Sequence, residues 1–232
     1  MRLFRVLALL LLLPSLAGCD LPRDPDGSLE QIRRGVLRVG VVHNPPWAVW
    51  TAVEPSGVEP ALLRELAARL GARIDWVQGP EQELLKALEQ GALHVVVGGF
   101  VDDNPWARQL GKTRPFHTTR LVVAARPQAP PLAELARAEV AAAPGSAASG
   151  YLLKKGAKPV DPYRGDWQYA ALPDWSLTDG SLRPTEHVLR EDKHVLLVAK
   201  GENGWLVTLE RFLDERGLAI LPLLRTHGRA SP

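Results

Sequence analysis

Residues 91–116, GALHVVVGGFVDDNPWARQLGKTRPF, decide the fold, because they read as a buried strand that ends in a polar loop. The run from Leu93 to Val97 is short and rich in valine, which suits a strand buried on both faces of a parallel sheet. Gly98 and Gly99 follow where that strand ends. Open α/β sheets bind ligands beyond the carboxyl ends of their strands, and paired glycines let a ligand approach the backbone. We therefore predict a ligand site at this loop.

A short helix is predicted directly after the glycine pair. Asp102 and Asp103 lead into Asn104, which is a good N-cap residue, and then into Pro105, which suits the first helical position. We therefore expect a helix over residues 106–110.

The chain before this stretch alternates predicted strands with predicted helices. Apolar periodicity indicates, in order, a strand, a helix, a strand and a helix at residues 36–42, 60–70, 74–77 and 80–90. This order predicts a parallel sheet in which the valine-rich run is the third strand. The loops after the first and third strands rise from the same edge of such a sheet, so Trp47 is expected beside Gly98.

Composition and motifs argue against several classes of function. The chain has 232 residues, of which 46% are hydrophobic, enough to bury a sizeable core in one large domain or two small lobes. A formal net charge of +2 gives no strongly basic face, so nucleic-acid binding is not expected. The six histidines form no HExxH pattern, and the sequence has no GxSxG motif, phosphate loop or dinucleotide fingerprint. We expect no metal and no cofactor.

The N-terminus reads as a secretion signal. Residues 1–18 contain two arginines, an apolar run and the small residues LAG directly before Cys19. This ending resembles a bacterial lipobox, which implies that Cys19 becomes the lipidated N-terminus and anchors the protein to the extracytoplasmic face of the cell membrane, on the periplasmic side. Cys19 is the only cysteine, so no disulfide can form within a monomer. Residues 19–34 are expected to be the lipidated end and a polar tether.

The ordered segments of the chain resemble the periplasmic solute-binding proteins of the polar amino acid type, which serve ABC transporters. The pieces that carry the resemblance are GVLRVGVVHNPPW, GVEPALLRELAARLG, LLKALEQGALHVVVGG, TRPF, AELARAEVAAAPGSAASGYLLKKGAKPV and HVLLVAKGENGWLVTLERFL. They follow the family's order and spacing over nearly all of the mature chain. No single piece is specific, and the combination carries the argument.

The resemblance implies an α/β fold with two lobes, in which two parallel-rich sheets are joined by two crossing strands. Lobe 1 would comprise residues 35–122 and 195–228, and lobe 2 would comprise residues 123–194 in a shortened form. The crossings are expected at 121–125 and 195–199. A final helix over Trp205–Arg216 would pack its apolar face on lobe 1. In lobe 2 the chain is too short for a second crossover helix, and the aromatic segment DPYRGDWQYA takes its place.

The resemblance also implies an arginine that pairs with a ligand carboxylate, because a guanidinium fork matches two oxygens. Arg108 is the first candidate, although it lies four residues after the cap Asn104 where the family has three. One extra residue turns a helix by about 100°, which could point the side chain away from the ligand. Arg114 in the TRPF segment is the substitute. A solvated surface position is the alternative for each arginine.

Further ligand contacts are implied on both lobes. In lobe 1 these are Trp47, the pair Gly98 and Gly99, and Asp102. The family's threonine contact falls on Val101 or, with the longer loop, on Asp102, which could instead be a solvated charge near a helix start. Glu59 stands at a helix start, where it could instead be a cap. In lobe 2, Gly145 and Ser146 precede a predicted helix whose free N–H groups favour an anion. Asp174 matches the family's partner for an α-amino group, although the shortened lobe weakens that match.

Tryptophan is abundant, with seven in the chain. Besides Trp47, four of them fall in or near predicted cleft loops, namely Trp50, Trp106, Trp167 and Trp175. Aromatic faces could sandwich a ligand or cage an ammonium group. For each of these four the competing reading is simple half-buried packing.

The leading interpretation is a monomeric, lipid-anchored solute-binding protein of an ABC importer, with an ABC permease as its membrane partner. It would capture a small amino-acid-like or carboxylate-bearing solute by lobe closure, without catalysis. One alternative is a periplasmic dehydratase or lyase on the same fold, for which Glu59, Asp102 and Asp174 are the candidate acids. Another is a ligand-sensing lipoprotein that works without a transporter.

Overall fold

The valine-rich strands of lobe 1 pair as the sequence predicts. In the computed structural model, which describes residues 24–178 and 180–229, β1 (Val36–Val41) lies between β2 (Arg73–Gln78) and β3 (Val95–Val97), parallel to both. The sheet has the order β2-β1-β3-β10-β4. Its last two strands, β10 (Leu197–Val198) and β4 (Gly111–Lys112), run antiparallel to their neighbours. The βαβαβ prediction is thereby confirmed.

Helices cover both faces of this sheet. One face carries α3 (Val58–Leu70) and α6 (Asn203–Arg229), which pack on each other, and the other carries α4 (Glu81–Glu89). Both helices bury apolar side chains against the sheet, among them Leu63 of α3 and Leu88 of α4, which are 0% exposed. Within the described ranges, no helix is both long enough and apolar enough to cross a membrane.

The expectation of a tether up to residue 34 is wrong from Asp24 onward. The short helix α2 (Ser28–Arg33) buries Ile32 completely in the core of lobe 1. The carboxylate of Glu202 accepts hydrogen bonds from the backbone N–H groups of Asp26 and Ser28, each at 2.9 Å. These two bonds join the segment to the residue directly before α6. The signal segment and Cys19 lie outside the described residues.

Lobe 2 is built on a second mixed sheet with the order β7-β6-β8-β5-β9. Its parallel part comprises β6 (Glu139–Ala141), β7 (Lys158–Val160) and β8 (Tyr169–Pro173), with β6 in the middle. The helix α5 (Ala147–Lys154) connects β6 to β7, and only a 3-10 turn, η3 (Pro162–Arg164), connects β7 to β8. The prediction that a crossover helix is missing is therefore confirmed.

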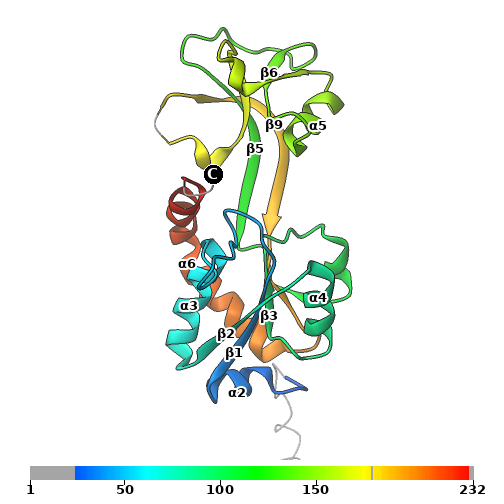
Figure 1. Ribbon diagram of the computed structural model, residues 1–232, viewed down its shortest axis with the longest axis vertical. Helices are drawn as coiled ribbons and strands as arrows, with labels where there is room; N and C mark the ends of the chain where they lie inside the picture. The colour runs from blue at the N-terminus through cyan, green and yellow to red at the C-terminus, as the bar shows by residue number, and fades with distance from the viewer. Residues whose placement is uncertain (1–23, 179, 230–232) are drawn as a thin grey trace, which may run out of the picture.

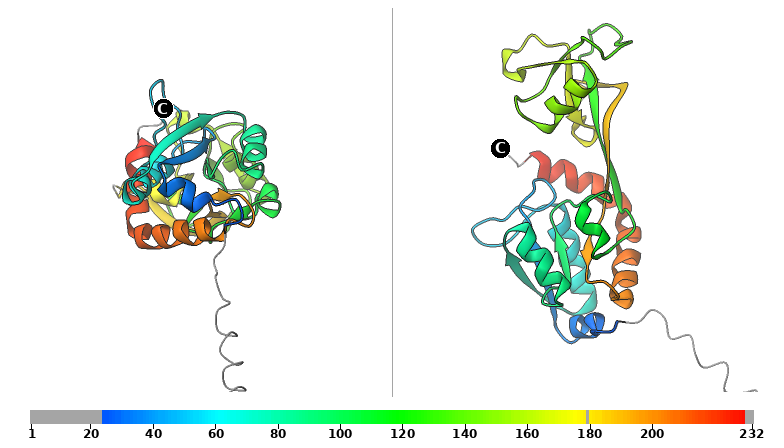
Figure 2. Two further views of the ribbon diagram at one scale, coloured as in Figure 1. Left: turned by 90° about the horizontal axis from the view of Figure 1, so that it is seen from below. Right: turned by 90° about the vertical axis from the view of Figure 1, so that its right-hand side faces the viewer.

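The two lobes are joined by two long strands that pair with each other. β5 (His117–Ala125) and β9 (Arg183–His194) run antiparallel from the His117–His194 pair to the Ala125–Arg183 pair. Figures 1 and 2 show them as the narrow connection between the lobes. Because residues 121–125 pair with β8 inside lobe 2, and residues 197–198 lie in the lobe 1 sheet, the expected crossing points were misplaced. The crossing lies instead at 117–120 and 191–194.

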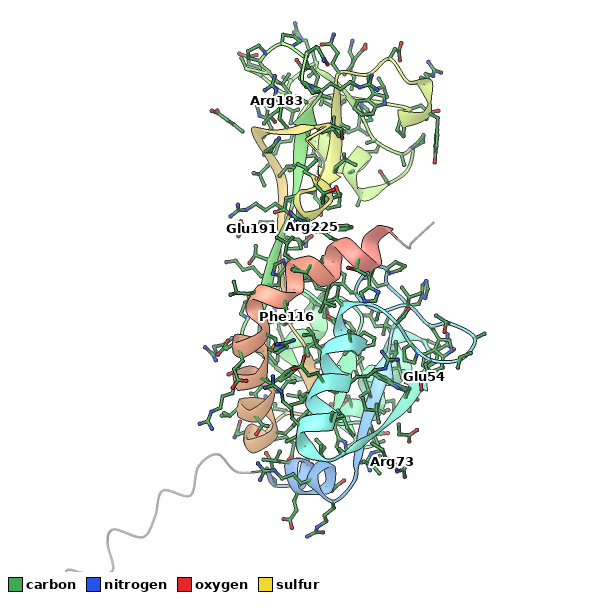
Figure 3. The ribbon with its side chains drawn as sticks, turned by 90° about the vertical axis from the view of Figure 1, so that its left-hand side faces the viewer. Glu54, Arg73, Phe116, Arg183, Glu191 and Arg225 are labelled. Atoms are coloured by element: carbon green, nitrogen blue, oxygen red, sulfur yellow. The ribbon has the colours of Figure 1, made fainter. Side chains whose placement is uncertain are left out.

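The last helix is longer than predicted and reaches lobe 2. It continues past Arg216 through Gly217 and Pro222, and its second half buries Ile220 and Leu224 completely. Arg225 lies at the height of the junction between the lobes (Figure 3). A Cβ on Gly228 would lie 2.3 Å from Cζ3 of Trp175, which belongs to the lobe 2 turn η4 (Asp174–Ser176). The end of α6 therefore forms a third connection between the lobes.

Candidate ligand-binding cleft

The lobes and the crossing strands enclose a cleft with a cavity volume of about 710 Å³. Lobe 1 contributes residues 44–47, Gly99 and Val101 to its lining, and lobe 2 contributes parts of β6, β8 and the start of α5. The crossing strands β5 and β9 form the wall between them. This volume falls within the roughly 300–1,000 Å³ that is typical of small-molecule sites.

The glycine pair is enclosed by the protein itself. One carboxylate oxygen of Glu59, Oε2, accepts the N–H of Gly98 at 2.7 Å and that of Gly99 at 3.0 Å, and Asn44 donates to the carbonyl of Gly98 at 2.8 Å. A Cβ on Gly99 would lie 2.4 Å from Cδ1 of Trp47. The sequence predicts that the glycines admit a ligand to the backbone. The close approach is made instead by Trp47, and Gly98 does not line the cleft.

Glu59 is fully buried and does not cap α3, whose N-cap is Gly57. Burial raises the pKa of Glu59 from 4.5 to about 7, although the N–H groups of Gly99 and Gly98 offset part of the effect. Its second oxygen, Oε1, is buried without a hydrogen-bond partner. This carboxyl group therefore holds the glycine loop in place and is shielded from the cleft.

Replacing Glu59 with glutamine should change how stability depends on pH. Because the folded-state pKa of Glu59 lies above its unfolded value of 4.5, protonation favours folding. That contribution is complete below pH 4.5 and is lost as the pH rises through about 7. We expect the free energy of unfolding of wild type to fall by about 3 kcal/mol relative to Glu59→Gln between pH 4.5 and about pH 8, as measured by urea denaturation. A constant difference across this range would contradict the titration of Glu59.

Trp47 lies where the first predicted loop meets the crossing strands. Its ring centroid is 3.8 Å from that of His194 and 6.1 Å from that of Phe116, and the ring is only 5% exposed. Burial, followed by the charge of His117, lowers the pKa of His194 to about 3, so its ring is neutral near pH 7. Trp47 lines the cleft as predicted, mainly as a packed element of its floor.

Neither candidate arginine lies in the cleft. Arg108 ends a 3-10 turn, η2 (Pro105–Arg108), in place of the predicted α-helix, and it is exposed outside the cleft lining. Arg114 donates to Glu210 at 3.0 Å and to Asp214 at 2.8 Å, both on α6. These placements correct the expectation that either arginine faces the ligand site.

The candidate aspartates also lie outside the cleft lining. Asp102 pairs with Lys112 at 2.5 Å, within lobe 1. Asp174 accepts the N–H of Trp175 at 2.8 Å. Its charge also acts on His117, whose pKa is lowered by burial and raised to a lesser degree by Asp174. Both carboxylates thus have partners within the protein.

Of the two predicted turn residues of lobe 2, one lies in the cleft lining. Ser146 is the N-cap of α5, accepts the N–H of Ser149 at 3.2 Å and lines the cleft, whereas Gly145 does not. Two further tryptophans, Trp167 and Trp175, line the cleft and Trp50 does not. The side chain of Trp106 lies outside the described part of the chain.

Three cleft residues of β9 were missed from the sequence. Arg190, Asp192 and His194 occupy alternate positions of the strand, so their side chains share the face that lines the cleft. The sequence indicates the second crossing at 195–199, and this prediction left residues 190–194 outside the expected site. The alternation in REDKH was the signal that could have identified them.

Paired charges characterise the cleft. Arg190 donates through Nε to Asp192, through Nη1 to the hydroxyl of Tyr151 at 2.7 Å, and more weakly to Asp103 at 3.4 Å. The guanidinium is therefore already engaged. Among the described residues, no group of three or more acidic, histidine or cysteine side chains could hold a metal ion. The arrangement suits reversible binding of a small molecule.

Comparison with known proteins supports this description. A sequence model of the bacterial extracellular solute-binding proteins, family 3, matches residues 37–216. The L-cystine solute receptor of Neisseria gonorrhoeae, in its unliganded open conformation, has a similar structure. The TM-score is 0.67 at 16% identity, over 88% of this chain and 96% of the receptor. An ancestral cyclohexadienyl dehydratase gives a TM-score of 0.60 at 18% identity, over 82% of this chain and 91% of the other. At these identities the likeness establishes the two-lobed fold.

The chain also matches a small part of a longer protein. The membrane-bound lytic murein transglycosylase F of Vibrio cholerae is 36% identical over 98 residues. The match spans 41% of this chain and 18% of that protein. The similarity is therefore confined to a small part of the larger enzyme.

Proposed function

Because the chain belongs to the bacterial extracellular solute-binding proteins of family 3, we propose that it captures a small solute between its lobes on the outer side of the cell membrane. The observation that carries this proposal is the cleft of about 710 Å³, which lies between the lobes beside the strands that join them. A hinge of two strands permits the lobes to close over a bound molecule. The proposed mechanism is binding followed by delivery to an ABC permease.

Lipid anchorage through Cys19 belongs to the same proposal. The support is the signal-like composition of residues 1–18 and the sequence LAGC, which both lie outside the described residues. The folded chain begins by Asp24, which accepts the N–H of Trp205 at 3.0 Å. Few residues would then separate the anchor from lobe 1, so the solute site would stay close to the membrane surface.

An amino-acid-like or carboxylate-bearing solute is the ligand class that the family resemblance implies. The N. gonorrhoeae receptor is named for L-cystine, and a cleft of this size could hold a molecule of that kind. A carboxylate in the cleft would have to pair with Arg120 or Arg190, the arginines in its lining. Each of these already has a carboxylate partner.

The chemistry of the cleft favours binding over catalysis. A lyase needs a carboxyl group with a raised pKa at the reacting atoms. Glu59 has the raised pKa, but it is 0% exposed and faces the glycine loop. Asp192 lines the cleft but is paired with Arg190. Among the described residues of the cleft lining, the lyase alternative therefore has no suitable acid.

The partial match to the V. cholerae transglycosylase favours one second candidate. There, a segment similar to this chain is part of a protein that is named for an enzymatic activity and not for transport. A ligand-sensing lipoprotein that works without a permease would fit that pattern. Loss of uptake of the bound solute in a deletion strain would support the importer role, and unchanged uptake would favour sensing.

Filling the cleft should abolish solute binding. A thermal-shift screen over amino acids, betaines, polyamines and organic acids would first identify a solute that stabilises the protein. Ala147 lines the cleft at the start of α5 and is exposed, so Ala147→Trp adds bulk there without entering the core. We expect at least a tenfold loss of affinity for that solute, measured by calorimetry.

The matched control is Ala68→Trp, which places the same bulk at an exposed position of α3 outside the cleft lining. Its affinity should equal that of wild type. Equal affinity in Ala147→Trp as well would locate binding elsewhere and contradict the proposal.

A further inference from the structure

The cations in the cleft are neutralised by the protein. Among the described residues, the charged side chains of the lining are Arg120, Arg190 and Asp192. Arg190 is paired with Asp192 and also donates to the hydroxyl of Tyr151 at 2.7 Å. Arg120 is paired with Glu191 at 3.1 Å. A ligand carboxylate would therefore have to compete with carboxylates that are already in place.

Most of the rest of the lining is aromatic or apolar, and its remaining polar side chains are Asn44, Thr119, Ser146 and His194. Asn44 already donates to the carbonyl of Gly98, and Thr119 and His194 bond to each other. The ring of Trp167 is held on one face by Arg126, whose Cζ lies 4.2 Å from its centroid, and its N–H donates to the carbonyl of Pro162 at 3.0 Å. The hydroxyl of Tyr151 is taken by Arg190. Since the polar atoms of these aromatic side chains have partners inside the protein, their ring surfaces are what they offer to a ligand. Alanines of β6 and β8 line the same cavity with methyl groups only.

Desolvation decides between ligand classes in such a site. An ammonium or carboxylate group that enters an apolar cleft without a free partner loses several kcal/mol of hydration. Burying a neutral ring contributes about 25 cal/mol of favourable free energy for each Å² of apolar surface removed from water. Contacts between the ring and aromatic faces add to this free energy. Its hydroxyl or amide groups can still bond to the Ser146 hydroxyl and to backbone groups of the lining.

We propose that the cleft selects an uncharged, ring-bearing solute that stacks on Trp167, in place of the zwitterion that the family resemblance implies. This inference rests on the proposed function, since it concerns the same cleft. It assigns Trp167 as the residue that determines specificity. It also assigns Arg190 to positioning, because its bond to the hydroxyl of Tyr151 joins β9 to α5.

Paired probes test the ligand class by calorimetry on the folded chain. N-acetyltryptophanamide and tryptophan both carry an indole ring, but the first is neutral and the second is a zwitterion. Methyl glucoside and glucuronate both carry a sugar ring, but the first is neutral and the second is an anion. In at least one pair we expect the neutral probe to bind at least tenfold more tightly than the charged one. Tighter binding of the charged probe in both pairs, or binding of none of the four, would overturn the inference.

Substitutions then test the role of Trp167 with the neutral probe that binds. Trp167→Leu should weaken its binding at least tenfold, and Trp167→Phe, which keeps a ring, should stay within about threefold of wild type. Trp76→Leu is the matched control, because Trp76 also carries an arginine on its ring, Arg64 at 5.3 Å, but lies outside the cleft. If Trp167→Leu does not fold, titrations of Trp167→Phe and Ala147→Trp with the neutral probe still test whether it binds in the cleft. Full binding by Ala147→Trp would overturn the inference.

Arg120→Gln separates the two ligand classes directly. Arg120 is exposed and lines the cleft, so its loss should change the affinity of the neutral probe by less than twofold. A tenfold loss would mean that a cation holds the ligand, which would overturn the inference. The proposed function is judged separately, by the Ala147→Trp titration with the solute found in the screen.

Discussion

Replacing Trp47 with alanine is expected to lower the free energy of unfolding by about 3 to 5 kcal/mol, the range typical of large aromatic side chains removed from a core. The ring is 5% exposed and stacks on His194 with 3.8 Å between the centroids. It also fills the space beside Gly99 where a Cβ would not fit. Its loss leaves a cavity at the point where the glycine loop meets the crossing strands. Urea denaturation monitored by circular dichroism measures the effect.

Trp50→Ala is the control for this substitution. Trp50 belongs to the same loop region but is only partly buried. Its replacement by alanine should therefore lower the free energy of unfolding by less. A loss below about 1 kcal/mol in Trp47→Ala would mean that the ring is not a packing element. In that case Trp47 would again be a candidate for direct contact with the ligand.

The second large effect is expected from the second half of α6. Ile220 and Leu224 are both 0% exposed and face the core of lobe 1. Truncating a buried Ile or Leu to alanine lowers stability by about 2 to 5 kcal/mol. We expect the double variant Ile220→Ala/Leu224→Ala to lose about 4 kcal/mol or more, measured by urea denaturation.

Leu218→Ala provides the matched control, because Leu218 lies on the same helix and is 97% exposed. Its substitution should change stability by less than about 0.5 kcal/mol. The sequence predicts that the last helix ends at Arg216. If the double variant were as stable as this control, the part of α6 beyond Arg216 would contribute nothing to the free energy of unfolding.

Periodicity was sufficient to predict the elements of lobe 1. Leu63 and Leu88 fall on apolar stripes, and both are fully buried in the helices that the pattern predicts. The parallel order then required the loops after β1 and β3 to meet, and Trp47 does pack on Gly99. These inferences succeeded because they depend on repeated spacing and on the geometry of parallel sheets.

The end of α6 could not be read in the same way. Gly217 and Pro222 are both poor helix residues, and either one normally signals a stop. The helix continues because Ile220 and Leu224 bury their side chains against lobe 1. Tertiary packing outweighed local preference, and the sequence alone does not display that packing.

The side chains of the site were predictable only in part, because small differences in backbone geometry redirect them. A 3-10 turn at Pro105–Arg108 replaces the predicted helix, and this changes where Arg108 points. Arg114 forms ion pairs with Glu210 and Asp214, which lie about 100 positions further along the chain. Such long-range partners leave no trace in local sequence.

The contact between Gly228 and Trp175 has a mechanical consequence for the hinge. Two paired strands such as β5 and β9 resist stretching, but they allow lobe 2 both to bend and to twist relative to lobe 1. A third point of support, to one side of β5 and β9 in Figure 1, makes the end of α6 a pivot. Rotation of lobe 2 about that pivot keeps Trp175 in place, whereas rotation away from it breaks the contact. If the lobes close as proposed, this contact restricts the directions in which lobe 2 can rotate without separating Trp175 from α6.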